Sequence, residues 1–138
     1  MATREEAELT DTFTARFSVE ALEAGRQTER EAVGSDFGNN GFTTLAQADE
    51  LGRLLKLGPD DLLLDIGSGT GWPGLYLATQ TACSVVVSDL TVAGMRHALR
   101  RATDDGIAAR ARVVVASARH LPFRPDSFDA IVHADVLC

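Results

Sequence analysis

The sequence has few of the features that mark several common classes of protein. Only two of its 138 residues are cysteines, Cys83 and Cys138, far apart and in no metal-ligand spacing. We therefore expect no metal site and a reducing, cytoplasmic setting. No apolar run approaches the roughly 18–20 residues needed to span a bilayer, and the acidic N-terminus lacks the apolar stretch of a secretory signal. We expect a soluble protein with no membrane span.

Positive charge is also scarce. The chain has 13 Lys and Arg residues against 20 Asp and Glu residues, a formal net charge of −7 at pH 7. Nucleic-acid binding depends on basic side chains that neutralise phosphates, and the sequence contains no basic stripe. We therefore expect a small-molecule substrate and no nucleic-acid partner.

What the chain does have is the length and apolar content, 45%, of one globular domain. Its first part has a helical pattern, because Thr3–Glu6 fits a capping box. Apolar residues then recur every four positions, as on one face of an amphipathic helix: Leu9, Phe13, Phe17 and Ala21. The pattern predicts a helix to about residue 33, broken near Ser18 or Gly25 and ended by Gly34.

Residues 34–42 form a loop by composition, with Phe37 and Phe42 among three glycines. The two aromatic side chains are either packing anchors or part of a lid over a binding site, and the sequence leaves both alternatives open. Thr44 and Gln47 then make a second capping box, which predicts a helix that ends before Gly58.

From residue 62 onwards, expected strands alternate with expected helices. The strands are 62–66, 84–88, 112–116 and 128–133, and the helices are 73–79 and 92–104. This order predicts an α/β fold with a parallel sheet. The last strand lies at the C-terminus, where it would be an uncovered edge. We therefore expect that the C-terminal part of the sheet is missing, or that a second copy covers the edge.

The most informative segment is the apolar strand that runs into alternate glycines, Leu62–Gly71. Glycines at this place let a ligand approach the backbone closely. Counted from Gly69, the segment fits the GxGxxG pattern of dinucleotide-binding proteins, with Asp89 twenty residues later. Counted from the strand, it is an acid, Asp65, followed by glycines at every second position.

Counted from Asp65, the chain resembles the class I (Rossmann-like) S-adenosylmethionine-dependent methyltransferases, in the branch that acts on small molecules. Three segments carry the resemblance: 62–71 is similar to the glycine motif, 85–90 to the second strand with its terminal acid, and 121–132 to the approach to the fourth strand. The resemblance implies a Rossmann-like parallel sheet with helices on both faces, S-adenosyl-L-methionine as cofactor, and methyl transfer to a metabolite, lipid or quinone. It divides the chain into a helical cap and lid loop, 1–58, and an incomplete cofactor-binding half, 59–138.

The resemblance also implies a cofactor site. The glycine loop would hold the methionine end, Asp65 its ammonium group, Asp89 the ribose hydroxyls and Leu90 the adenine ring. The two acids have an alternative as helix-capping or turn residues. The implied cofactor-binding residues are Asp65, Gly67, Ser68, Gly69, Thr70, Gly71, Asp89, Leu90, Ser117, Ala118 and Arg119.

One position departs from the family pattern. The family often has an acid after the third strand that accepts a hydrogen bond from the adenine amino group, and Ser117 stands there in this chain. Serine accepts one hydrogen bond without charge. Ala118 and Arg119 offer backbone N–H groups to the ring.

Catalysis by direct displacement at a methyl carbon depends mainly on alignment of the reacting atoms. His133 and Asp135 are the candidate catalytic residues, with His133 as a general base for a hydroxyl or amine acceptor. The alternative for His133 is a strand-end residue bonded to the backbone. Two other functions stay open: a nicotinamide-dependent oxidoreductase built on the same loop, and a fragment that binds S-adenosylmethionine without catalysis.

Overall fold

A computed structural model describes residues 3–38 and 41–136 of the chain. Three helices come first: α1 (Arg4–Arg16), α2 (Val19–Ala32) and α3 (Leu45–Leu55). Strands and helices then alternate as β1 (Leu62–Ile66), α4 (Gly74–Thr81), β2 (Ser84–Asp89), α5 (Val92–Asp104), β3 (Ala111–Val115) and β4 (Ala130–His133). Cys138 and the side chain of Ala21 lie outside the described residues.

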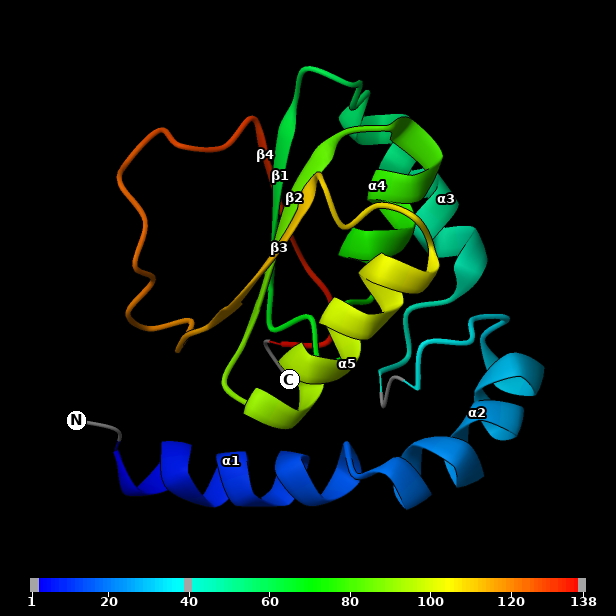
Figure 1. Ribbon diagram of the computed structural model, residues 1–138, viewed down its shortest axis with the longest axis vertical. Coiled ribbons are helices and arrows are strands. Elements are labelled where there is room, and N and C mark those ends of the chain that lie inside the picture. Colours follow the sequence, from blue (N-terminus) through cyan, green and yellow to red (C-terminus); the bar gives the residue numbers. More distant parts are fainter. Residues whose placement is uncertain (1–2, 39–40, 137–138) are drawn as a thin grey trace.

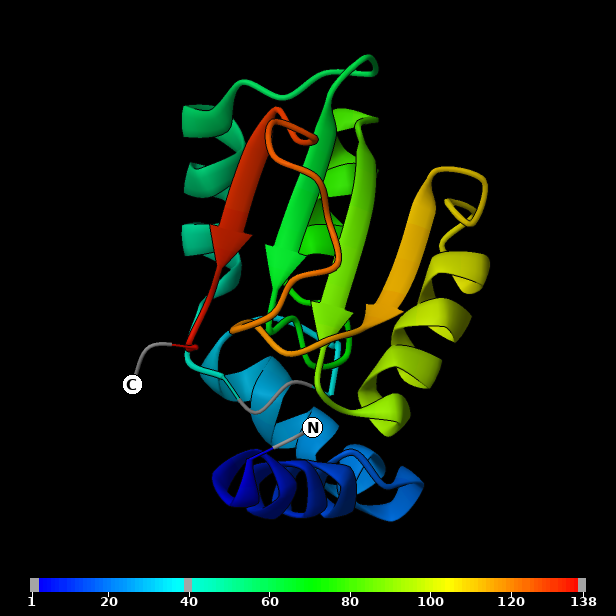
Figure 2. The same cartoon turned by 90° about the vertical axis from the view of Figure 1, so that its left-hand side faces the viewer.

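The four strands form one parallel sheet in the order β3-β2-β1-β4, which confirms the expected α/β fold. The register pairs Leu62 with Ser84 and Leu63 with Ala130, so all four strands end at the same edge. Because the strands run downwards in Figure 1, this carboxyl edge lies at the bottom of the sheet, directly above α1 and α2. Figure 2 shows the same arrangement from the side.

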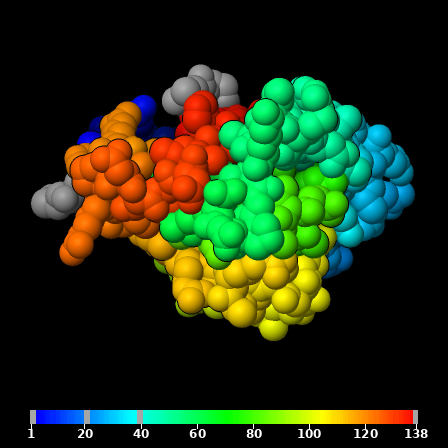
Figure 3. Space-filling view, turned by 90° about the horizontal axis from the view of Figure 1, so that it is seen from above, coloured from blue at the N-terminus to red at the C-terminus, as the bar shows by residue number. Residues whose placement is uncertain are grey.

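Helices cover one face of the sheet in the described part of the chain. Figure 1 shows α3, α4 and α5 on one side of the strands and the segment 116–129 on the other. The expectation of helices on both faces was therefore wrong for these residues. The connection from β3 to β4 contains Pro122 and Pro125, which disfavour a helix. Figure 3 shows this segment (orange) projecting from one side of the molecule next to β4 (red).

The core lies between the sheet and its helices. Leu63 and Val85 are completely buried, and they pack with Leu75 of α4 and Ala98 of α5. Alternate strand residues face the other way, and Ile131 on β4 is 56% exposed there.

The predicted details of the N-terminal part are mostly confirmed. Both capping boxes are present, at Thr3 and at Thr44. The helix breaks between α1 and α2 at Ser18, and Gly25 lies inside α2. The apolar face of α1 is only partly buried, because Phe17 is 4% exposed whereas Leu9 is 42% exposed. None of the helices formed by residues 3–38 and 41–136 has the length and apolarity to span a membrane.

The two aromatic residues of the 34–42 loop have different environments. Phe37 is buried, and its ring centroid lies 5.0 Å from that of Trp72. Phe42 is 82% exposed. Phe37 is therefore a packing anchor, and the role of Phe42 in a lid stays a prediction.

Candidate functional site

The loop between β1 and α4 has a backbone that requires glycine. Gly67, Gly69 and Gly71 have φ values of 68°, 58° and 101°, which side chains rarely allow. Space is limiting as well, since a Cβ atom on Gly67 would lie 2.5 Å from Val136. The loop is also tied to β2, because the Ser68 N–H donates to the Ser88 carbonyl at 3.0 Å. The sequence pattern therefore predicted a real backbone cradle at the carboxyl edge.

Asp65 lies beneath this loop and is completely buried. Its Oδ2 accepts a hydrogen bond from the Gly74 N–H at 2.7 Å, at the start of α4. Its buried Oδ1 has no hydrogen-bond partner among the described residues. Burial raises the pKa of Asp65 well above its usual range, the Gly74 N–H lowers the pKa, and the nearby charge of Asp89 raises it. Oδ2 of Asp65 thus acts as the helix-capping alternative predicts, because it binds the first N–H of α4. A contact of Asp65 with a ligand ammonium group stays a prediction.

The raised pKa of Asp65 predicts how stability depends on pH. An acid whose pKa is raised by folding holds its proton more tightly in the folded state, so its contribution to stability falls as the pH rises above the unfolded pKa. The Asp65→Asn variant lacks this titration. We expect the difference in Tm between variant and parent to shift in favour of the variant from about pH 4 to pH 8, measured by calorimetry. A difference that stays constant with pH would contradict the raised pKa.

Asp89 ends β2 and connects three parts of the site. Its Oδ2 accepts from the Gly69 N–H at 3.0 Å, and its Oδ1 accepts from the Thr91 N–H at 2.9 Å and the Thr91 hydroxyl at 2.8 Å. Thr91 in turn caps α5. Asp89 and the next residue, Leu90, are half-buried at the same edge. The carboxylate therefore holds the glycine loop against the start of α5. Oδ1 is fully used by its two Thr91 donors, whereas Oδ2 retains one lone pair for a ligand hydroxyl.

The residues after β3 lie next to Asp89, because the Ala116 N–H donates to the Asp89 carbonyl at 2.9 Å. The Ser117 hydroxyl donates to the Glu6 carboxylate at 2.6 Å. Arg119 forms an exposed ion pair with Glu5 at 3.1 Å, a contact that contributes little to stability. Ala118 is exposed. This contact of Glu6 with a predicted site residue was not expected, because the capping box indicates only the place of Glu6 in the first turn of α1.

The two candidate catalytic residues at the end of β4, His133 and Asp135, differ in their hydrogen-bond contacts. His133 is exposed and pairs with Ile66 of β1. The Asp135 Oδ2 accepts from the Phe42 N–H at 2.9 Å, the Thr43 N–H at 3.2 Å and the Thr43 hydroxyl at 3.1 Å. Asp135 thus holds residues 42–43 at the carboxyl edge, and a catalytic role for Asp135 stays a prediction.

Two further contacts that hold the segment between α2 and α3 were not predicted. The buried Glu29 carboxylate accepts from the Phe37 N–H at 3.0 Å, the Gly38 N–H at 2.6 Å and the Ser35 hydroxyl. The Trp72 indole N–H donates to the Thr43 carbonyl at 3.1 Å. The described residues at the two ends of this segment are therefore fixed to α2, to Trp72 next to the glycine loop and to Asp135 after β4.

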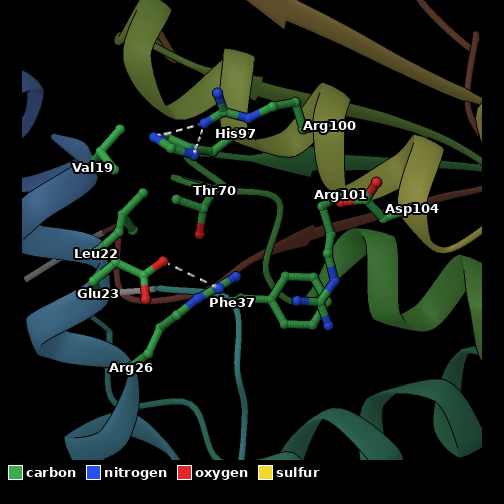
Figure 4. Close-up of a pocket in the computed structure, with 10 residues that line it drawn as sticks. All are labelled: Val19, Leu22, Glu23, Arg26, Phe37, Thr70, His97, Arg100, Arg101 and Asp104. Carbon is green, nitrogen blue, oxygen red and sulfur yellow. Dashed lines mark hydrogen bonds and ion pairs between the residues drawn. The ribbon is translucent and has the colours of Figure 1, made fainter.

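A cavity of about 310 Å³ opens between α2 and α5 (Figure 4). Of the glycine loop, only Thr70 lines it. The Arg101 guanidinium stacks over the Phe37 ring at 4.1 Å, and Arg26 forms an ion pair with Asp36 at 3.4 Å. Because two of its three arginines are engaged in this way and the acidic side chains of Glu23 and Asp104 line it too, we assign it no ligand.

Comparisons with known proteins agree with this geometry. Residues 63–138 match the protein family described as "Methyltransferase domain". Methyltransferase GfsG of Streptomyces halstedii is 31% identical over 83 residues, which are 60% of this chain and 30% of that protein. The ubiquinone/menaquinone biosynthesis C-methyltransferase UbiE of Geotalea daltonii is 32% identical over 84 residues, 59% of this chain and 36% of that protein. The chain thus spans about a third of the length of these relatives.

Solved structures show the same fold. Geranyl diphosphate C-methyltransferase from Streptomyces coelicolor A3(2) matches with a TM-score of 0.72 at 21% identity, over 96% of this chain and 55% of that one. A methyltransferase from Geobacter sulfurreducens, in complex with S-adenosyl-L-homocysteine, matches with a TM-score of 0.61 at 24% identity, over 67% and 37%. Because the family match covers more than half of the chain and the fold agrees, the chain belongs to the class I, Rossmann-like family of S-adenosylmethionine-dependent methyltransferases.

Proposed function

We propose that this chain binds S-adenosylmethionine at the carboxyl edge of the sheet and supports methyl transfer to a small-molecule acceptor. The observation that carries the proposal is the glycine cradle held by the Asp89 carboxylate, with Gly69 N–H to Oδ2 at 3.0 Å. The cofactor supplies an electrophilic methyl group on a sulfonium centre. A cationic ligand without phosphate suits the glycine loop and the end of β2, because no Lys or Arg occurs between Lys56 and Arg96.

The fit extends to the individual groups. Asp89, half-buried at the end of β2, has one free acceptor site, on Oδ2, for a ribose hydroxyl, and would accept from the second hydroxyl once the Thr91 hydroxyl turns away from Oδ1. The glycine loop would hold the methionine end, and the unpartnered Oδ1 of Asp65 would receive the ammonium group if the loop moves enough to expose it. Adenine would lie towards Leu90 and residues 117–119. His133 is our proposed acceptor-side residue, because it is the exposed imidazole at the end of β4.

The class of acceptor is part of the proposal. The relatives include a C-methyltransferase of ubiquinone and menaquinone biosynthesis and a sterol methyltransferase-like protein, which supports a small apolar acceptor. The net charge of −7 supports a small-molecule acceptor over a nucleic acid. The two isolated cysteines support a cytoplasmic setting.

The free edge of the sheet supports a further part of the proposal. β4 is an edge strand with Ile131 56% exposed, which supports the proposal that further sheet or a second copy covers it.

The test is a binding comparison by isothermal titration calorimetry. We expect saturable binding of S-adenosylmethionine and S-adenosylhomocysteine, and none of NAD. Transfer of labelled methyl from the cofactor to quinone or sterol acceptors then measures catalysis. Binding of NAD in place of S-adenosylmethionine would overturn the proposal. Cofactor binding with no transfer to any acceptor would support the binding-only alternative for this chain.

A further inference from the structure

Glu6 is an unusual residue of α1. The helix is largely exposed as it crosses below the carboxyl ends of the strands (Figures 1 and 2), yet Glu6 is only 6% exposed. A charged side chain is rarely buried without a specific set of hydrogen bonds. The burial of Glu6 therefore calls for an explanation beyond the helix itself.

Two contacts hold the Glu6 carboxylate. Its Oε2 accepts from the Thr3 N–H at 2.8 Å, which completes the capping box. Its Oε1 accepts from the Ser117 hydroxyl at 2.6 Å, across 111 positions of sequence. The capping box needs only the first contact. The second places an acid of the N-terminal helix at the end of β3.

This place lies one strand beyond Asp89. β3 pairs with β2 so that Val115 is opposite Asp89, and Ser117 follows two residues later. A ligand whose ribose is held by Asp89 would extend its base in this direction. The segment 116–125 contains no Asp or Glu of its own. Glu6 is thus a carboxylate brought by α1 to a segment that lacks one.

We propose that Glu6 accepts a hydrogen bond from the exocyclic amino group of the cofactor adenine, and that Ser117 positions the carboxylate for this contact. The inference rests on the proposed binding of S-adenosylmethionine. Hydrogen bonds from Ser117 and from the Thr3 backbone lower the pKa of Glu6 to about 2. At neutral pH the side chain is therefore ionised, and it accepts hydrogen bonds but donates none. A carboxylate there favours adenine, which has a donor at its position 6, over hypoxanthine, which has an acceptor there.

The test compares two ligands, S-adenosylhomocysteine and its 6-oxo analogue S-inosylhomocysteine, by calorimetry on the full chain. Glu6→Gln is the informative variant, because glutamine preserves the capping box and also offers an amide donor. We expect the parent to prefer the adenine ligand, and E6Q to bind it roughly tenfold more weakly while the preference over the 6-oxo analogue collapses.

Glu5→Gln is the matched control, since Glu5 is the neighbouring acid of the same turn and is exposed. E5Q should keep the parent's affinities for both ligands. Ser117→Ala removes the positioning contact. It should reduce the preference for S-adenosylhomocysteine over the 6-oxo analogue, as E6Q does, but by a smaller factor. If E6Q fails to fold, this second variant still tests the inference.

Two results would overturn the inference alone. In one, E6Q binds both ligands with the parent's preference. In the other, E6Q binds S-adenosylhomocysteine more tightly, which would make Glu6 a latch that competes with the ligand. A parent protein that binds no S-adenosylhomocysteine would instead overturn the proposed function, and this inference with it.

Discussion

Asp89→Asn is expected to weaken the binding of S-adenosylmethionine by about a hundredfold, because a charge-assisted hydrogen bond to the ligand is lost and the glycine cradle is disturbed. All three protein groups that contact the Asp89 carboxylate are donors: the Gly69 N–H, the Thr91 N–H and the Thr91 hydroxyl. Asparagine has one acceptor oxygen and one NH₂ group. Its NH₂ group would therefore face either the Gly69 N–H or the Thr91 donors, and no hydrogen bond can form between two donors. The variant would therefore lose the negative charge and release either the glycine loop or the start of α5.

Asp61→Asn is the control for this substitution. Asp61 accepts from the Gly58 N–H at 2.7 Å, just before β1, at the opposite edge of the sheet. We expect D61N to lower the Tm slightly and leave the cofactor Kd unchanged. Calorimetric titration measures the Kd, and circular dichroism checks that both variants fold. A folded D89N protein with the parent's Kd would remove Asp89 from the site.

Gly94→Ala is expected to destabilise the protein by about 1–3 kcal/mol and to abolish tight cofactor binding. A Cβ atom on Gly94 would lie 2.5 Å from the carbonyl oxygen of Gly69 and 2.8 Å from the Thr91 hydroxyl. The first of these is backbone, so it cannot rotate away as the end of a long side chain would. Helix α5 would have to move off the glycine loop, and the cradle would lose its shape.

Gly25→Ala separates this steric effect from helix propensity. Gly25 lies within α2 with nothing inside 4 Å of the added Cβ atom. Alanine is favoured over glycine in an open helical position by roughly 0.5–1 kcal/mol, so G25A should raise the Tm and bind the cofactor as the parent does. Thermal melts and the cofactor Kd measure both variants. Equal behaviour of G94A and G25A would show that α5 does not pack on the loop as described.

The sequence predicted the site unevenly. The glycine cradle and the acid at the end of β2 were found from residues 62–71 and Asp89, because a strand, its terminal acid and a glycine turn are local patterns. The roles of individual side chains were harder to predict. Asp65 is expected to meet a ligand, and this stays a prediction. That it is wholly buried and bonded to the start of α4 could not be predicted, since the direction of a strand side chain depends on which face the helices cover.

The 34–42 loop shows the same limit. Composition could not distinguish Phe37, which packs on Trp72, from Phe42, which is 82% exposed. Their difference comes from the Glu29 and Asp135 carboxylates, which bind the backbone on either side of the loop. Those acids lie on α2 and after β4, so no pattern within the loop could reveal them.

By itself the sequence determined the helix caps, the strand segments and the glycine turn, because these depend on residues a few positions apart. The tertiary structure alone decided that helices cover one face of the sheet in the described residues. It alone placed Glu6 against Ser117, 111 positions away. Contacts of that separation form only when strand order and helix docking bring distant segments together, and no local preference of either residue encodes them.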